Sequence, residues 1–151
     1  MPIAENSADF VYCSHVLEHL SLEDCRMALR NTFKILKPNG IFRCVLPDLE
    51  YEAKNYSSNT DSEASILFLK RTGLGQDKRK YDLLSMLREF YGNSKYRWMW
   101  DYKSLSSELK AVGFNSVRRA YFNDSSYDIF KTVETESRWE NALGIEAKKC
   151  A

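Results

Sequence analysis

The sequence predicts an α/β fold built on a parallel pair of strands joined by a helix. Three observations support this prediction. The run from Phe10 to Cys13 is apolar and rich in β-forming residues, residues 22–36 repeat apolar side chains at helical spacing, and residues 41–46 are again apolar apart from Arg43. Nearly continuous apolar runs are typical of strands covered on both faces. Strand, helix and strand in this order form a βαβ unit, whose crossover is right-handed.

The first predicted helix covers residues 22–36. Ser21 can cap its first turn, and the acidic residue three positions later supports that turn. Residues 38–40, Pro-Asn-Gly, end the helix and turn the chain into the second strand. The face expected to pack on the sheet carries apolar or small side chains: Cys25, Ala28, Leu29, Thr32, Phe33 and Leu36.

The same reasoning places elements along the rest of the chain. Further helices are predicted at residues 49–56, 63–70, 81–91 and 102–112, and further strands at residues 115–122 and 142–148. Asp101 is a good N-cap for the last helix, and Gly113 stands at its C-terminal end. Residues 129–140 are ambiguous.

Two loops carry patterns that resemble nucleotide-binding features. Residues 73–80 contain Gly-x-Gly followed by three basic residues, but they lack the strand-loop-helix context of a phosphate loop. Residues 96–100, YRWMW, are dense in aromatic side chains that can stack on bases. The overall charge gives no support to that interpretation, so we expect these rings to pack over the sheet or to line a substrate pocket.

The run DFVYCSHVLEHL and the later stretch LKPNGIFRCVLPDL resemble strands four and five of class I S-adenosylmethionine-dependent methyltransferases, most closely the type 11 group. The resemblance continues through DYKSLSSELKAVGF and ends at LGIEAKK. It implies a partial Rossmann-like sheet with flanking helices and with strands in the order four, five, seven, six. In that sheet, strand seven runs antiparallel between its neighbours.

The family's glycine-rich cofactor loop and its ribose-binding acidic residue would precede Met1, and residues 1–151 do not contain them. We therefore expect a single domain that corresponds to the C-terminal half of the fold. It would be a truncated reading frame, a fragment, or one partner of a split enzyme. Without the loop whose amides line the cofactor, this chain is expected to bind S-adenosylmethionine weakly or not at all.

Polar residues gather where the first strand passes into the helix, the place where ligands bind in open α/β sheets. The resemblance implies that Ser14, His15 and Val16 border the methionine end of the cofactor, mainly through backbone atoms. His19 would face the substrate or anchor the helix start. Asp48, after the next strand, would shape the acceptor site or simply cap the following helix. Both histidines can equally be packing residues, and no side chain stands out as a catalytic base.

His15 to His19 also fit H-x-x-E-H, a spacing used by inverted zinc peptidases. That mechanism needs both histidines on one helical face and a third ligand from elsewhere. The helix is predicted to begin only after Ser21, and the sequence has no third histidine. We therefore expect no metal site.

Composition narrows the possible partners and location. A formal net charge of +1 offers no broad field for nucleic acid or an anionic membrane. No stretch is apolar and long enough to span a bilayer, and the first residues do not form a signal peptide. The four cysteines show no C-x-x-C pairing, which fits a reducing compartment. We expect a cytoplasmic protein.

Two functions of different classes remain open. The chain is either a methyltransferase, or the acceptor-side half of one, acting on an unknown substrate, or a catalytically inactive remnant that acts as an assembly module. Without strands one to three, the run from Phe10 to Cys13 becomes a sheet edge, and apolar edges are templates for pairing with another chain. The expected partner is a second copy of the chain or a complementary N-terminal half.

Overall fold

The computed structural model describes residues 3–75 and 96–150, and a four-stranded mixed sheet forms their centre. The strands are β1 (Ala8–Ser14), β2 (Leu36–Pro47), β3 (Phe114–Ala120) and β4 (Ala142–Lys149), in the order β1-β2-β4-β3. β1 is parallel to β2, whereas β4 is antiparallel to both β2 and β3. The predicted fold class, strand order and strand directions are confirmed.

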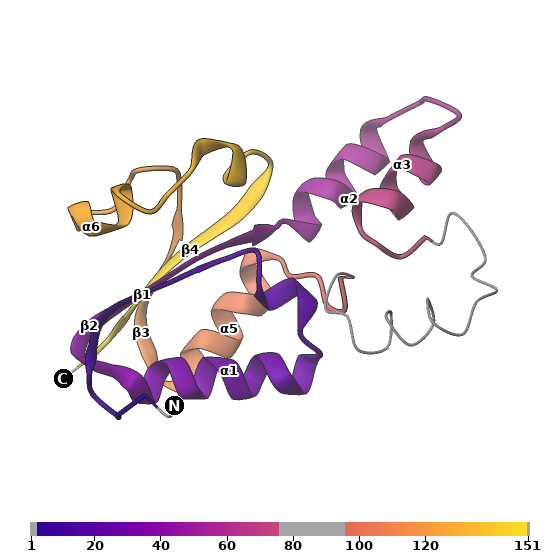
Figure 1. The fold of residues 1–151 in the computed structure, drawn as a ribbon. Helices are drawn as coiled ribbons and strands as arrows, with labels where there is room; N and C mark the ends of the chain where they lie inside the picture. The colour runs from indigo at the N-terminus through magenta and orange to yellow at the C-terminus, as the bar shows by residue number, and fades with distance from the viewer. Residues whose placement is uncertain (1–2, 76–95, 151) are drawn as a thin grey trace, which may run out of the picture.

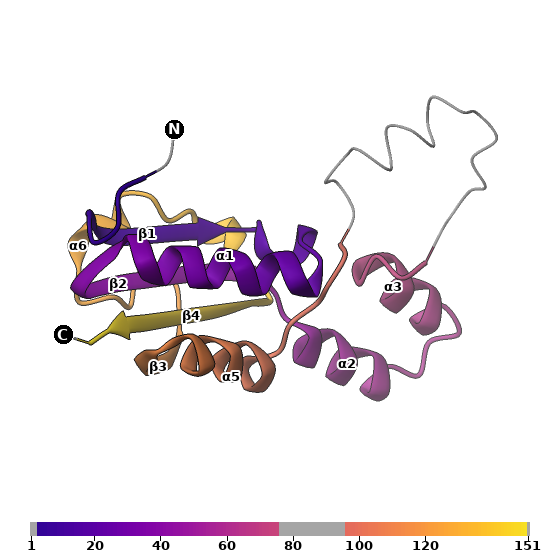
Figure 2. The ribbon, with the colours of Figure 1, turned by 90° about the horizontal axis from the view of Figure 1, so that it is seen from below.

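The helix α1 (Leu22–Ile35) forms as predicted and packs beside α5 (Tyr102–Val112) on one face of the sheet (Figures 1 and 2). Ser21 caps α1 by accepting a hydrogen bond from the Asp24 N–H. Phe33 is only partly buried, with its ring edge-on to Phe114 at 5.1 Å. The core between this face and the two helices consists mainly of fully buried apolar side chains: Cys25, Leu29, Leu36, Phe42, Cys44, Leu46, Trp100, Leu105, Leu109, Phe114, Leu143, Ile145 and Ala147.

The start of β2 differs from the prediction. The strand begins at Leu36, because Leu36 pairs with Ala8 before the register shifts at the turn residues 38–40. Asn39 adopts a left-handed backbone with φ +66°. A side chain at Gly40 would lie 2.8 Å from the carbonyl oxygen of Lys37. The Pro-Asn-Gly turn therefore lies inside a strand as an irregularity rather than in front of it.

The remaining helices also follow the sequence pattern. Asp101 and Ser104 form a capping box at the start of α5, and Gly113 ends that helix with φ +120°. The helices α2 (Leu49–Ser58) and α3 (Ala64–Arg71) extend away from the sheet (Figure 1). The region left ambiguous contains α6 (Asp128–Lys131) and the 3₁₀ turn η2 (Glu136–Arg138). The helix predicted at residues 81–91 and the basic part of the loop at 73–80 lie outside the described residues.

Two general features of the described chain bear on function. All four cysteines are free thiols, and Cys25 and Cys44 are buried. Burial raises the pKa of the Cys25 thiol to about 12 and that of the partly buried Cys13 to about 11. These two thiols therefore stay protonated near neutral pH and serve as small apolar packing groups. In the described residues, no helix has the length and apolar character needed to cross a membrane.

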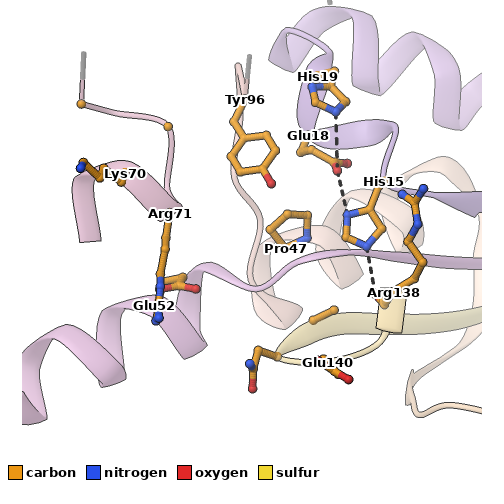
Figure 3. A pocket seen from close by; sticks show the side chains of 14 residues that line it. His15, Glu18, His19, Pro47, Glu52, Lys70, Arg71, Tyr96, Arg138 and Glu140 are labelled. Atoms are coloured by element: carbon orange, nitrogen blue, oxygen red, sulfur yellow. Dashed lines mark hydrogen bonds and ion pairs between the residues drawn. The ribbon is translucent and has the colours of Figure 1, made fainter. Parts of the chain in front are cut away.

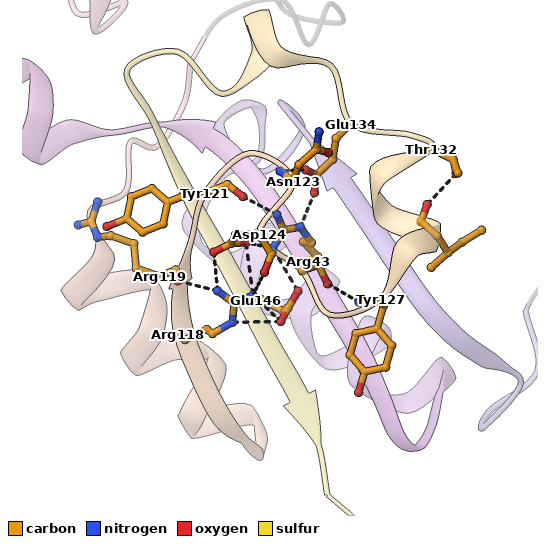
Figure 4. Close-up of polar contacts among 12 residues, drawn as sticks. Arg43, Arg118, Arg119, Tyr121, Asn123, Asp124, Tyr127, Thr132, Glu134 and Glu146 are labelled. Atoms are coloured by element: carbon orange, nitrogen blue, oxygen red, sulfur yellow. Dashed lines mark hydrogen bonds and ion pairs between the residues drawn. The ribbon is translucent and has the colours of Figure 1, made fainter.

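The opposite face of the sheet carries a fully buried arginine, Arg43, in the middle of β2. Its guanidinium is shared among four oxygen groups (Figure 4). Nη1 donates to Asp124 at 2.9 Å and to Glu146 at 3.1 Å, and Nη2 donates to the Tyr121 carbonyl at 2.7 Å. Nε donates to Glu134, which is itself fully buried. The charge is therefore neutralised by several partners, as a buried guanidinium requires.

A second arginine and an aromatic ring complete this cluster. Arg118 binds Asp124 at 2.6 Å and Glu146 at 2.8 Å from the more exposed side. The Trp139 ring lies over the Arg43 guanidinium, with its centroid 4.6 Å away. The cluster holds the loop that follows β3, the segment before β4, and β2 together. It thereby fixes the path of residues 121–139 across this face.

We predict that Arg43→Leu lowers the free energy of unfolding by about 3–5 kcal/mol, because it leaves the buried Glu134 carboxylate without its cation. The matched control is Arg118→Leu, whose side chain is 42% exposed and which should cost only about 1 kcal/mol. Urea unfolding followed by circular dichroism measures both values. Equal losses of unfolding free energy for the two variants would show that the burial of Arg43 does not make its ion pairs more important for stability than those of Arg118.

Candidate functional site

A cavity of about 820 Å³ lies where β1 and β2 end and β4 begins (Figure 3). The cavity thus lies beyond the carboxyl ends of the two parallel strands, which is where open α/β folds bind ligands. The side chains around it come from the end of β1 and η1 (Leu17–His19), from α2 and α3, and from the segments that precede α5 and β4. Its lining includes His15, Glu18, His19, Pro47, Glu52, Arg71, Tyr96, Arg138, Glu140 and Asn141.

The backbone changes direction sharply at His15, the residue that follows β1. Its N–H donates to the Val45 carbonyl at 2.8 Å, and its φ is +52°, in the left-handed region. Residues other than glycine seldom adopt this conformation, although histidine and asparagine tolerate it better than most. The turn ends the strand and leads into η1. Asn141, on the opposite wall of the cavity, has a similar φ of +56°.

Both ring nitrogens of His15 face hydrogen-bond acceptors. Nε2 lies 2.9 Å from the carbonyl oxygen of Arg138, which can only accept, so Nε2 carries a proton. Nδ1 lies 3.3 Å from Oε1 of Glu18. The Glu18 carboxylate raises the pKa of His15, and this effect outweighs the opposing effect of burial. The positively charged form of His15 is therefore the form that satisfies both neighbours.

Glu18 is the least exposed charged group in the cavity lining, with a side chain 1% exposed. Neither carboxylate oxygen accepts a hydrogen bond within the described part of the chain. His15 and His19 flank Oε1 from opposite sides, at 3.3 Å and 3.9 Å (Figure 3). Leaving a buried acceptor without a donor costs about 1–3 kcal/mol, and more if it is charged.

The backbone of Glu18 anchors a separate segment at the cavity. Its carbonyl oxygen accepts hydrogen bonds from the N–H groups of Arg97 at 2.7 Å and Trp98 at 3.2 Å. This contact places Tyr96 in the cavity lining, with its ring 5.6 Å from that of His19. Burial, together with the charges of Glu18 and Glu52, raises the pKa of Tyr96.

The aromatic segment 96–100 therefore divides between the two roles that the sequence suggested. Tyr96 lines the cavity, whereas Trp100 is buried in the core beneath α5. Trp98 remains 42% exposed. Trp100 therefore has the predicted packing role, whereas the prediction of a substrate pocket stays a prediction for the cavity that Tyr96 lines.

The predicted site residues separate into two groups. His15 and His19 line the cavity, whereas Ser14 and Val16 are not among its lining residues, and Val16 is 49% exposed. Asp48 is also absent from the lining. Its Oδ1 accepts hydrogen bonds at the N-terminus of α2, and its Oδ2 lies 3.1 Å from Arg119. Asp48 thus has the capping role that was one of its two alternatives, and its assignment to the substrate side stays a prediction.

The H-x-x-E-H spacing falls on a strand end and a 3₁₀ turn rather than on a helix. Consequently the two imidazoles do not share a helical face, and they lie on opposite sides of Glu18 (Figure 3). Within residues 3–75 and 96–150, no three His, Cys, Asp or Glu side chains are grouped so that they could hold a metal ion.

Sequence reasoning gave no role to several residues of the cavity. Glu18 lies between His15 and His19 in the polar stretch that follows the first strand. This position is the one sequence feature that could have indicated a role for it. Arg138 and Asn141 belong to or adjoin the region that was ambiguous, and Tyr96 was named only as one of several aromatics. Their convergence depends on long-range contacts, such as the one between His15 and the Arg138 carbonyl.

Comparison with known proteins supports the methyltransferase resemblance. A family model described as a methyltransferase domain matches residues 1–44, which include β1, η1 and α1. No curated protein sequence matches the chain.

Several solved structures share the fold. A methyltransferase from Archaeoglobus fulgidus that depends on S-adenosylmethionine is 16% identical, with a TM-score of 0.52 over 97% of this chain and 62% of its own. A putative O-methyltransferase from Nostoc punctiforme is 12% identical, with a TM-score of 0.52 over 97% of this chain and 33% of its own. Human N-acetylserotonin methyltransferase, solved with its cofactor, is 14% identical, with a TM-score of 0.51 over 100% of this chain and 31% of its own.

These matches confirm that the chain has the fold of class I S-adenosylmethionine-dependent methyltransferases. The type 11 resemblance agrees with the family model at the residues that carry the strand-to-helix passage. The chain spans between 31% and 62% of the length of the three proteins described.

We predict that the His15 ring titrates above its ordinary value of about 6.5 and that Glu18→Gln lowers its pKa. Because the folded-state pKa is raised, the contact stabilises the protein fully below the unfolded-state pKa and loses this effect as pH rises through the folded value. The stability difference between wild type and His15→Gln should therefore be larger near pH 5.5 than near pH 8.5. Histidine NMR titration and urea unfolding at both pH values test this.

The signal of His15 must be distinguished from the signals of the other ionisable groups near the cavity. Those that line it or lie beside the His15–Glu18 contact are Cys13, His19, Glu52, Lys70, Arg71, Tyr96, Arg138 and Glu140. A His15 pKa that stays the same in Glu18→Gln would contradict the prediction, because the carboxylate is the first cause of the shift.

Proposed function

We propose that this chain is the acceptor-side half of an S-adenosylmethionine-dependent methyltransferase. The observation that carries the proposal is the position of the cavity in this fold. It adjoins the β1 end, where the resemblance assigns the methionine part of the cofactor to Ser14, His15 and Val16. The methyl acceptor would occupy the cavity, and its identity is open. The predicted cytoplasmic location stays a prediction.

Charged residues of the cavity lining suit the methionine end of S-adenosylmethionine. The methionine end is a zwitterion, and the wall of the cavity before β4 presents one charge of each sign, on Glu140 and Arg138. When bound, S-adenosylmethionine supplies an electrophilic methyl group on a positively charged sulfur. The contribution of this chain would be to hold the acceptor beside that methyl group, since alignment is the main requirement of a displacement reaction.

We predict that the 151-residue chain on its own binds S-adenosylmethionine with a dissociation constant above about 1 mM. Residues 1–151 include no glycine-rich loop whose amides would line the cofactor. Residual binding should perturb the amide resonances of Ser14, His15 and Val16 in a ¹⁵N-labelled sample. Adenosine and methionine, titrated separately, show which end of the molecule causes the shifts.

Two outcomes would count against this prediction. A dissociation constant in the low micromolar range, about −8 kcal/mol, would show that this chain needs no additional loop. Shifts confined to residues remote from the β1 end, such as the face of α1 near Arg26, would place the binding site elsewhere.

A second candidate function, an assembly module without catalysis, is favoured by the position of β1. It is the first strand in the order of the described sheet, so one side of its backbone has no strand partner there. Phe10 on this strand is 40% exposed. A groove of about 600 Å³ lined by Ile3, Ala28 and Ile35 lies beside α1. Unpaired backbone groups at such an edge favour pairing with another strand.

For this module we propose a homodimer in which two β1 strands pair antiparallel across a two-fold axis. A complementary N-terminal half that supplies the missing strands is the alternative partner. Both arrangements extend the sheet at the same edge.

We predict that the wild-type chain is dimeric at micromolar concentration in light-scattering measurements and that Val11→Lys weakens the dimer by placing charge at the junction. Because Val11 also packs against the core, the circular dichroism spectrum must show that the variant is folded. Met27→Lys, on the exposed face of α1, is the matched control and should leave the dimer unchanged. A stable wild-type monomer would exclude the homodimer.

A further inference from the structure

The Glu18 carboxylate is the group in the cavity whose surroundings are least complete. Its side chain is 1% exposed, and neither oxygen accepts a hydrogen bond from the described residues. His15 approaches Oε1 only, at 3.3 Å, and its other ring nitrogen is engaged by the Arg138 carbonyl at 2.9 Å. Even with His15 protonated, therefore, Oε2 has no donor from the described residues.

The other charged side chains of the lining do not supply that donor. Arg71 lies 3.8 Å from Glu52, and this pair belongs to α2 and α3 at the far wall (Figure 3). Arg138 contacts His15 through its backbone carbonyl rather than through its guanidinium. A ligand that enters the cavity would meet a buried negative charge with hydrogen-bonding capacity to spare.

The shape around Glu18 indicates which kind of donor fits. The two imidazoles of His15 and His19 flank the carboxylate on opposite sides, and Tyr96 lies next to His19 (Figure 3). A carboxylate flanked by two rings suits a compact donor better than a wide planar guanidinium. An ammonium carries three N–H donors on one atom, and an adjacent aromatic ring such as that of Tyr96 attracts it further.

We propose that Glu18 anchors a ligand bearing a primary ammonium group and that the methyl acceptor belongs to this class. The assignment of the ligand as acceptor rests on the proposed function. The ammonium site itself does not, because it requires only the cavity and Glu18. The ammonium donates to the Glu18 oxygens, while the body of the ligand lies along Pro47 and Tyr96, which also line the cavity.

The test compares three probes with the same four-carbon body: n-butylammonium, 1-butanol and butyrate. Each is titrated into the ¹⁵N-labelled full chain near pH 7.5, and amide shifts of Leu17, Glu18 and His19 report binding. We expect n-butylammonium to bind at least about tenfold more tightly than 1-butanol, and butyrate to cause no shifts at these residues. Equal binding of the ammonium and the alcohol, or no binding by any probe, overturns the proposal.

Two variants assign the effect to one side chain. Glu18→Gln keeps the shape and removes the charge, so n-butylammonium should lose its advantage over 1-butanol. Glu108→Gln removes the same charge on α5, where Glu108 pairs with Arg26 away from the cavity, and should keep that advantage. Preference for the ammonium retained in Glu18→Gln overturns the proposal. If Glu18→Gln does not fold, the comparison of probes on the wild-type chain still decides.

These outcomes are independent of the cofactor titration. Binding of n-butylammonium at Glu18, together with cofactor shifts confined to residues remote from the β1 end, would support the ammonium site and count against the methyltransferase assignment. Cofactor shifts at Ser14, His15 and Val16 without ammonium preference would do the reverse.

Discussion

The buried charge of Arg43 is the constraint on which much of this structure depends. A guanidinium in the middle of a sheet is tolerated only when its hydrogen bonds are satisfied and its charge is compensated. Here the partners come from the loop after β3, from β4 and from the segment before β4. The hydrogen bonds and ion pairs of Arg43 therefore fix segments that have little regular structure of their own. These segments, within residues 121–139, cover the second face of the sheet.

The same constraint reaches the cavity. Trp139 stacks on Arg43, and its neighbour Arg138 presents its backbone carbonyl to His15. His15 in turn faces Glu18, whose carbonyl holds Arg97 and Trp98. Interactions on one face of the sheet are thus connected to the geometry of a site at its end. The connection from Arg43 to Glu18 runs through the packed ring of Trp139 and the hydrogen bond between the Arg138 carbonyl and His15.

The buried carboxylates of Glu134 and Glu18 have different surroundings. Glu134 is buried together with its cation and stabilises the fold. Glu18 is equally buried, but its Oε2 has no hydrogen-bond donor in the described chain, and it lies in a cavity. Left-handed backbone at His15 and Asn141 adds local strain around that cavity. Unsatisfied polar groups and strained backbone at one place are typical of sites that are completed by a ligand.

The sequence by itself determined the four strands except the start of β2, the helices α1, α2, α3 and α5, and the caps at Ser21, Asp101 and Gly113, because apolar periodicity and capping residues act locally. It also placed His15 and His19 at the strand end, and the resemblance supplied the strand order. Only the tertiary structure decided that Asp48 caps α2 and binds Arg119, that Arg43 is buried, and that Glu18 lacks a donor. The physical reason is that burial and hydrogen-bond satisfaction depend on partners far away in the chain, such as residues 134 and 138, which no local pattern connects to Arg43 or His15.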